Sequence, residues 1–244
     1  MAQRPQLRIK DAGVALASVD EMSSSQVAES TSFIAKVLLD DARRRTLKHA
    51  AVLGALSDGE LQTQENIGQL LQHLYKSGIA IEQSTLSHHL KILRKVGLLQ
   101  SQKVGLQRFF SLNPEGATKA VTILSKCLNL EITEDSTIFR FSEAEAPERV
   151  IALYKHLAQP WHALVINAFM VAGGLGLGSQ DVIRVLIEGF GATPIQARNS
   201  LSIMQKTGVL RTAAPQKHNG LQILTWTKEE MIQALNYLRF LIIP

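Results

Sequence analysis

The chain contains one cysteine and no long apolar run, and each shortage excludes a class of protein. Cys127 has no second cysteine to pair with, so an intramolecular disulfide framework is excluded and a reducing compartment is favoured. The uncharged stretch at residues 161–180 is interrupted by His162, Asn167 and several glycines, so its apolar part is too short to span a membrane. Residues 1–13 lack the apolar core of a secretory signal. We therefore expect a cytoplasmic protein.

Two segments, residues 84–99 and 195–210, are diverged copies of one pattern. Both place apolar residues at positions i, i+4 and i+7, which predicts one buried stripe on a helix. The stripes are Leu86, Leu90 and Leu93 in the first copy, and Ala197, Leu201 and Met204 in the second. Gly97 and Gly208 follow the stripes, where a left-handed helix cap favours a residue without Cβ. This internal repeat outranks any single-residue signal in deciding the architecture.

Each copy is followed by a Gly-Leu-Gln sequence, at residues 105–107 and 220–222, that leads into a short strand pattern. The order helix, glycine, strand, turn, strand is that of a recognition helix and a β-wing. The second helix also has a start signal, because Thr193 and Gln196 form a capping-box pattern around Pro194. We predict a mainly α fold with small β-wings, in which two tandem winged helix-turn-helix domains are joined by a helical, acidic linker.

The expected domains follow from this pattern. They are a tail at residues 1–31, disordered or a basic arm; an N-terminal winged-helix domain at 32–114; a helical linker at 115–159; and a C-terminal winged-helix domain with a closing helix at 160–244. The expected helices are 32–39, 42–56, 61–78, 84–96, 117–128, 147–158, 161–171, 179–190, 194–207 and 228–242. The expected hairpins are 98–112, with its turn near 103–105, and 209–227.

The outer faces of the two repeated helices are polar and basic. Residues 83–112 contain five basic residues and no acidic one, and residues 193–227 contain four and none. Because the whole chain carries only +5, the remaining residues carry a net charge of −4. Positive charge concentrated on two helix-and-hairpin units predicts binding to a polyanion.

Hydroxyl, amide and basic side chains of these units are the candidate DNA contacts, since such groups read base edges and hold phosphates. In the first unit they are Ser84, Thr85, Ser87, His88, Lys91, Arg94, Lys95, Lys103 and Arg108. In the second unit they are Gln196, Arg198, Asn199, Ser202, Gln205 and Lys217. The alternative for each helix is an ordinary solvated face, but such a face usually mixes both signs of charge.

Other sequence patterns predict no nucleotide-binding, catalytic or metal site. The glycine-rich segment 173–179 matches neither the dinucleotide fingerprint, which needs glycine at Ser179, nor a P-loop. No Ser/His/Asp, Cys/His or paired-carboxylate arrangement has a recognisable spacing, and Cys127 stands alone, so we expect no enzyme, no cofactor and no metal site. The basic run Arg43–Arg45 is either a solvated helix face or a phosphate contact, and both alternatives stay open.

Residues 84–99, read as STLSHHLKILRKVGLL, resemble the recognition helix of the ArsR-type winged helix-turn-helix regulators. Residues 108–112 are similar to the second wing strand of that family, and the resemblance covers residues 36–113. It implies that the wing flanks the DNA backbone, and that His89 packs between helices. It also implies that the following residues face the major groove: Ser84, Thr85, Ser87, His88 and Lys91.

The family usually has one winged helix per chain and dimerises through terminal helices, whereas here a second unit follows in tandem. The tandem layout also resembles that of plasmid replication initiators, in architecture only. The sequence therefore predicts a nucleoid-associated, sequence-specific double-stranded DNA-binding protein, a transcriptional regulator that reads two half-sites. The alternatives are a plasmid-type replication or partition factor, and a winged-helix scaffold for protein interactions. A homodimer through the terminal helices, a small-molecule effector and the partner of the second unit are left open.

Overall fold

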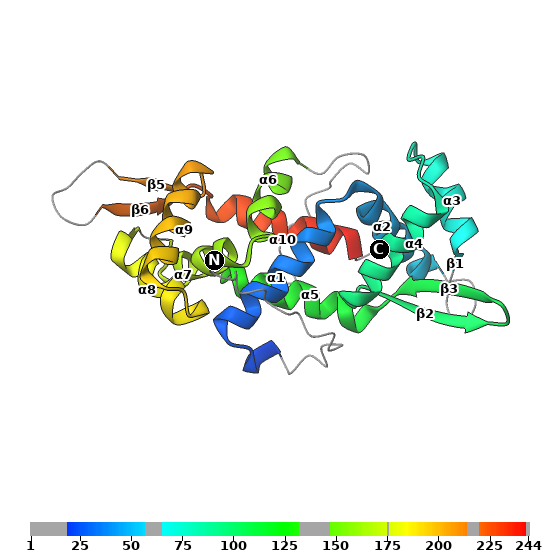
Figure 1. Ribbon diagram of the computed structural model, residues 1–244. Coiled ribbons are helices and arrows are strands. Elements are labelled where there is room, and N and C mark those ends of the chain that lie inside the picture. The colour runs from blue at the N-terminus through cyan, green and yellow to red at the C-terminus, as the bar shows by residue number, and fades with distance from the viewer. Residues whose placement is uncertain (1–18, 57–64, 132–146, 175, 214–219, 243–244) are drawn as a thin grey trace, which may run out of the picture.

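The computed structural model describes residues 19–56, 65–131, 147–174, 176–213 and 220–242 (Figure 1). In these residues the fold is mainly helical with two small antiparallel sheets, as the sequence predicts. The two hairpins lie at opposite ends of an elongated molecule, and a group of helices lies between them.

The first unit begins after the short 3-10 helix η1 (Val19–Glu21) and helix α1 (Ser24–Leu38). Its helices are α2 (Asp41–Leu56), α3 (Ile67–Lys76) and α4 (Gln83–Lys95). Its strands are β1 (Glu65–Asn66), β2 (Leu99–Val104) and β3 (Gln107–Leu112). β3 lies between the other two strands in an antiparallel sheet of order β1-β3-β2.

The second unit repeats this order of elements. Its helices are α7 (Pro160–Val171), α8 (Ser179–Phe190) and α9 (Pro194–Lys206). Its strands are β4 (Leu177–Gly178), β5 (Leu210–Thr212) and β6 (Leu221–Leu224), in the order β4-β6-β5. In both units the strand that precedes the second helix pairs with the last strand of the hairpin. The repeat seen in the sequence is therefore also a repeat of topology.

The two units end their repeated helices with the same hydrogen bonds. Gly97 and Gly208 follow α4 and α9 with φ of 83° and 75°, a left-handed conformation that glycine adopts without strain. After the hairpins, Asn113 Nδ2 donates to the Gly97 carbonyl at 2.8 Å, and Thr225 Oγ1 donates to the Gly208 carbonyl at 2.5 Å. Each bond ties the end of the hairpin to the end of the preceding helix, which fixes the angle between helix and wing.

Four helices join the units: α1, α5 (Pro114–Leu128), α6 (Glu148–Leu157) and α10 (Lys228–Ile242). α1 packs against α5, α6 and α7, while α10 packs against α2, α5 and α6 (Figure 1). One continuous hydrophobic core includes buried residues from both units and from these helices. Buried hydrogen bonds cross between them, since Ser32 Oγ donates to the Ala158 carbonyl and Tyr154 OH donates to the Ala234 carbonyl. The two units are thus parts of one packed body.

Several helix boundaries agree with the sequence prediction because strong local signals set them. Helices α8 and α10 have the predicted bounds. Thr193 and Gln196 form the predicted capping box of α9. Thr227 and Glu230 bond in the same reciprocal way at the start of α10.

Other boundaries correct the prediction. The predicted tail at residues 1–31 ends earlier, because α1 begins at Ser24 with a capping box of Ser23 and Gln26. Helix α5 begins at Pro114, which suits the first turn because proline has no N–H to leave unbonded. The first hairpin turns at Gly105 and Leu106, one residue beyond the predicted turn. The acidic part of the linker, 132–146, lies outside the described residues.

Candidate nucleic-acid interface

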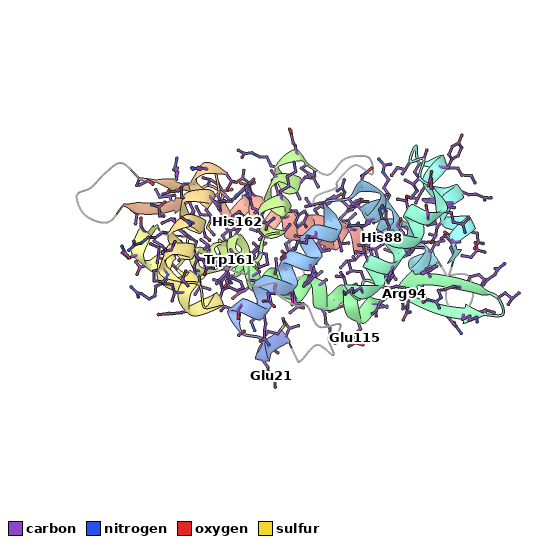
Figure 2. The ribbon with its side chains drawn as sticks, in the orientation of Figure 1. Glu21, His88, Arg94, Glu115, Trp161 and His162 are labelled. Carbon is purple, nitrogen blue, oxygen red and sulfur yellow. The ribbon has the colours of Figure 1, made fainter. Side chains whose placement is uncertain are left out.

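Helix α4 separates its apolar residues from its polar ones. Leu86, Leu90 and Leu93 are buried in the core of the first unit. All the predicted contact residues of this helix are exposed on other sides: Ser84, Thr85, Ser87, His88, Lys91, Arg94 and Lys95. His88 and Arg94 lie at the end of the molecule that carries the β2–β3 hairpin (Figure 2). The helix therefore presents a continuous hydroxyl, imidazole and basic surface to solvent.

The two adjacent histidines of α4 have different surroundings. His88 is exposed, whereas His89 is buried, with its Nε2 3.5 Å from Asp40 Oδ2. Burial lowers the pKa of His89 below its ordinary value, and the Asp40 carboxylate opposes this effect. His89 therefore packs inside the unit as the family resemblance implies, and only His88 is placed to contact a ligand.

An acidic side chain, that of Glu82, borders this surface at the start of α4. Glu82 occupies the N-cap position of α4 and is exposed, but its side chain makes no capping bond to the helix backbone. Its Oε2 accepts a hydrogen bond from Ser84 Oγ at 3.2 Å. Because Glu82 lies one residue before the acid-free stretch, its negative charge lowers the attraction of the helix N-terminus for an anion.

The first hairpin carries two basic residues directly opposite each other. Lys103 and Arg108 are register partners on β2 and β3, and both are exposed. Like charges directly opposite on neighbouring strands destabilise a hairpin. The turn that follows them uses Gly105 with φ of 61° and places Leu106 at the tip, fully exposed. The pair therefore has no stabilising role in the hairpin itself and is suited to an external anion.

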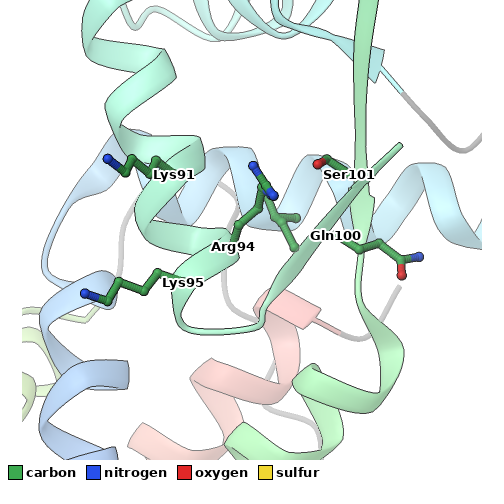
Figure 3. Close-up of a pocket in the computed structure, with 6 residues that line it drawn as sticks. Lys91, Arg94, Lys95, Gln100 and Ser101 are labelled. Carbon is green, nitrogen blue, oxygen red and sulfur yellow. The ribbon is translucent and has the colours of Figure 1, made fainter. Parts of the chain in front are cut away.

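An open pocket lies between the last turns of α4 and strand β2. The residues that line it are Lys91, Arg94, Lys95, Leu99, Gln100 and Ser101. Figure 3 shows the Arg94 guanidinium between the helix and Ser101, while Lys91 and Lys95 extend from the outer side of the helix. The pocket combines cationic groups on the helix with a hydroxyl on the strand, a donor set that suits a phosphate oxygen.

Helix α9 also has a buried stripe and an exposed face. Ala197, Leu201 and Met204 are buried, as the repeat predicts. Arg198 and Asn199 are exposed, and Ser202 is half-buried. These three residues are the part of the predicted second set whose side chains are placed to contact a ligand.

The other predicted residues of the second set are used within the chain or lie outside the described residues. Gln196 Oε1 accepts a hydrogen bond from the Thr193 backbone N–H, so this amide caps its own helix. Gln205 Nε2 donates to Gln222 Oε1 at 2.9 Å and to Thr212 Oγ1 at 3.1 Å. Both amides therefore have structural partners: the capping pattern in the sequence predicts that of Gln196, whereas no sequence pattern predicts those of Gln205. Lys217 lies outside the described residues.

The sequence prediction does not include the exposed apolar residues of α9, because helical periodicity was applied only to its buried stripe. Ile195 and Ile203 expose 71% and 52% of their surface, although both lie on the repeated helix. A signal was present in the sequence, since Ile195 stands where the first copy has Ser84, a polar position.

The basic run at the start of α2 contributes to the fold through hydrogen bonds within the chain. The buried Arg44 donates to the Leu38 carbonyl and to Asp41 Oδ1. Arg45 donates to Asp41 and to the Ser77 carbonyl at the end of α3, and Arg43 donates to the Lys36 carbonyl. These guanidinium groups join the ends of α1, α2 and α3.

In the described residues, no group of three His, Cys, Asp or Glu side chains is arranged to hold a metal ion. Burial raises the pKa of the Cys127 thiol to about 12, so it stays protonated at neutral pH. In the same residues no helix has the length and apolar character to cross a membrane.

The fold and the surface of the first unit define a winged helix-turn-helix, a class of DNA-binding domain. Residues 51–101 match the family model described as bacterial regulatory protein, arsR family. The matched segment runs from α2 through α3 and α4 into β2, so the first unit is similar to an ArsR-type winged helix. This similarity supports a DNA-binding transcriptional regulator. No curated protein and no solved structure matched the chain in the comparisons.

Proposed function

We propose that the protein is a sequence-specific transcriptional regulator that reads two half-sites of double-stranded DNA, one with α4 and one with α9. The observation that carries this proposal is the placement of two exposed basic faces at equivalent positions of a repeated fold. Residues 83–112 and 193–227 hold nine basic and no acidic residues. An acid-free face of this kind attracts a polyanion and releases its counterions on binding.

In the first unit, His88, Lys91 and Ser87 enter the major groove, while Lys103 and Arg108 contact phosphates. The N-terminal and central part of a recognition helix reads base edges in this class of domain, and the wing lies against the backbone. The pocket beside Arg94 takes a phosphate oxygen. Ser84, Thr85 and Lys95 complete the contact surface of α4.

In the second unit, Arg198, Asn199 and Ser202 form the corresponding contact surface. We propose that residues 32–114 and 160–244 form two winged-helix domains and that residues 115–159 form the linker. Because one core joins them, the spacing between the two recognition helices is fixed by the protein. A monomer then acts as a pseudo-dimer on an asymmetric site. A homodimer would instead double the number of half-sites, which sedimentation of the protein with and without DNA tests.

Two alternatives differ in a measurable way. A replication or partition factor uses the same surfaces on repeated sites, so it binds arrays rather than one operator. A protein-interaction scaffold lacks affinity for random-sequence duplex and shows little salt dependence. The cationic surfaces of both units favour DNA over the scaffold.

The test is a footprint of the full-length chain on a site selected from random duplexes. We expect protection longer than one helical turn, because recognition helices in successive major grooves lie about 34 Å apart. His88→Ala with Lys91→Ala should weaken binding about 5- to 150-fold per lost base contact and abolish protection on one side only. Arg198→Ala with Asn199→Ala should abolish protection on the other side.

Lys155→Ala is the matched control, since Lys155 is an exposed cation on α6 outside both repeated units. It should leave the footprint unchanged. Protection confined to one turn, unaffected by the Arg198 and Asn199 substitutions, removes the second unit from the DNA. Absence of salt-dependent binding to any duplex refutes the proposed function as a whole.

A further inference from the structure

The exposed surface of α9 differs in chemistry from that of α4. Ile195 and Ile203 are among the most exposed large apolar residues of the described chain, although the opposite side of α9 is well buried in the core. Their equivalents in α4 are the exposed hydroxyl of Ser84 and the half-buried Ile92. The fold of the unit does not require two exposed isoleucines on this helix, because its core is filled by other residues.

The two isoleucines flank an exposed amide. Ile195, Asn199 and Ile203 are spaced four residues apart, which places them as neighbours along one row of the helix surface. Asn199 is exposed, and its amide makes no hydrogen bond with the residues that the structure describes. The row therefore presents an amide with an aliphatic side chain on each side.

This combination matches the major-groove edge of an A·T base pair. Adenine presents N7 as an acceptor and N6 as a donor, which a single asparagine amide satisfies with two hydrogen bonds. Thymine presents a C5 methyl group, which apolar side chains recognise by contact. No other base pair in unmodified DNA offers an amide partner and a methyl group together.

The charge around the row favours DNA over an apolar protein surface. Arg198, Lys206 and Arg211 are exposed on α9 and β5. No acidic residue occurs between Thr193 and Thr227. Cations that surround an apolar row suit a ligand whose phosphates flank its methyl groups, and such a ligand is a DNA duplex.

The exposed surface of α4 carries imidazole and cationic side chains in place of aliphatic ones. His88 and Lys91 are exposed side by side, four and seven residues after Ser84, with no exposed large aliphatic residue on that helix. Lysine donates to the paired acceptors O6 and N7 of guanine. The two helices therefore carry different recognition chemistry on the same scaffold.

We propose that α9 reads an A·T-rich half-site by contact of Ile195 and Ile203 with thymine methyl groups and by pairing of Asn199 with adenine, while α4 reads a guanine-containing half-site. This inference rests on the proposed DNA-binding function and names the bases that each helix reads. The operator is then asymmetric in composition, which fixes the direction in which the protein lies on the DNA.

The test removes the thymine methyl groups without changing the base pairing. A site selected by the full-length protein is prepared once with thymine and once with uracil throughout, and the affinities are compared at one salt concentration. We expect the uracil duplex to bind about fourfold more weakly for each buried methyl contact. Ile195→Ala with Ile203→Ala should bind both duplexes equally, because the contacts that distinguish them are gone.

Two controls separate this result from other effects. Val171→Ala truncates another exposed aliphatic residue, at the end of α7, and should keep the discrimination between thymine and uracil. A third duplex with 7-deazaguanine removes the N7 acceptor and should weaken binding through Lys91 but leave the thymine effect unchanged. Circular dichroism verifies that the exposed substitutions do not alter the fold.

The outcomes are distinct. Equal binding of thymine and uracil duplexes by the unmodified protein overturns the inference but leaves DNA binding intact. If the isoleucine substitutions also leave the affinity unchanged, the exposed row is available to a protein partner instead. Failure to bind any duplex overturns the proposed function and the inference together.

Discussion

Replacing both basic residues of the first hairpin should raise stability and weaken DNA binding at the same time. Lys103 and Arg108 face each other across β2 and β3, so each destabilises the hairpin through the charge of the other. Substitution of both by threonine removes the repulsion and adds a favourable cross-strand pair. The free energy of unfolding should therefore rise by about 0.2–1 kcal/mol.

The effect on binding follows from counterion release. If each residue contacts one phosphate, the slope of log K against log salt should become shallower by about 1.8. Between 50 and 200 mM salt, the loss of affinity of the variant should then be about 12-fold smaller than that of the unmodified protein. Fluorescence anisotropy with specific and random duplexes measures the slope, and urea unfolding measures the stability.

The prediction requires that the free energy of unfolding rises while the affinity for DNA falls. A structural role of the pair predicts that stability and affinity fall together. An unchanged salt slope also refutes the reasoning, because it removes the hairpin from the phosphates. Lys155→Gln is the control for the loss of a surface cation on a helix, because glutamine has a helix propensity close to that of lysine, and it should change neither slope nor stability.

Three further changes have outcomes set by the structure. Glu82→Gln removes the acidic group beside α4 and should strengthen binding to specific and random duplexes, as measured by anisotropy. Gln205→Ala leaves the buried amide of Gln222 without one partner, so urea unfolding should show a loss of about 1–3 kcal/mol, with a smaller change in DNA affinity. Burial and the neighbouring His156 lower the pKa of His162 from 6.5 to about 4, so the unfolded chain binds a proton that the folded chain does not. The free energy of unfolding should therefore fall as pH falls from about 6.5 towards 4, and His162→Leu should flatten this fall in urea titrations at several pH values.

Much of the fold could be predicted from the sequence because its signals are local. The apolar stripes of α4 and α9 are determined by helical periodicity, and Pro194 marks the start of α9. The start of α1 was also encoded locally, by Ser23 and Gln26, but the polar residues of its first turns hid it. Strands β1 and β4 have no such signal, because two residues become a strand only by pairing with a distant hairpin.

The candidate site was predictable on α4 for the same reason. Once Leu86, Leu90 and Leu93 are assigned to the buried side of the helix, the remaining polar positions are expected to face solvent. On α9 the same reasoning failed for Gln205, because its partner Gln222 lies on strand β6, distant in the sequence, and is almost fully buried. Periodicity determines which side of a helix faces outward, but not whether a side chain there is already bonded to a neighbouring element.

The hydrogen bonds of Gln205 show how the second unit differs from the first. Gln205 stands where the first unit has Arg94, and Thr212 stands where it has Ser101. In the first unit, Arg94 and Ser101 line an open pocket between helix and wing. In the second unit, the side chain of Gln222 forms hydrogen bonds with both Gln205 and Thr212. The first unit thus has an open cationic pocket that suits a phosphate, where the second unit has a neutral amide network that fixes the wing. Under the proposed function, the outer face of α9 would therefore supply the DNA contacts of the second unit.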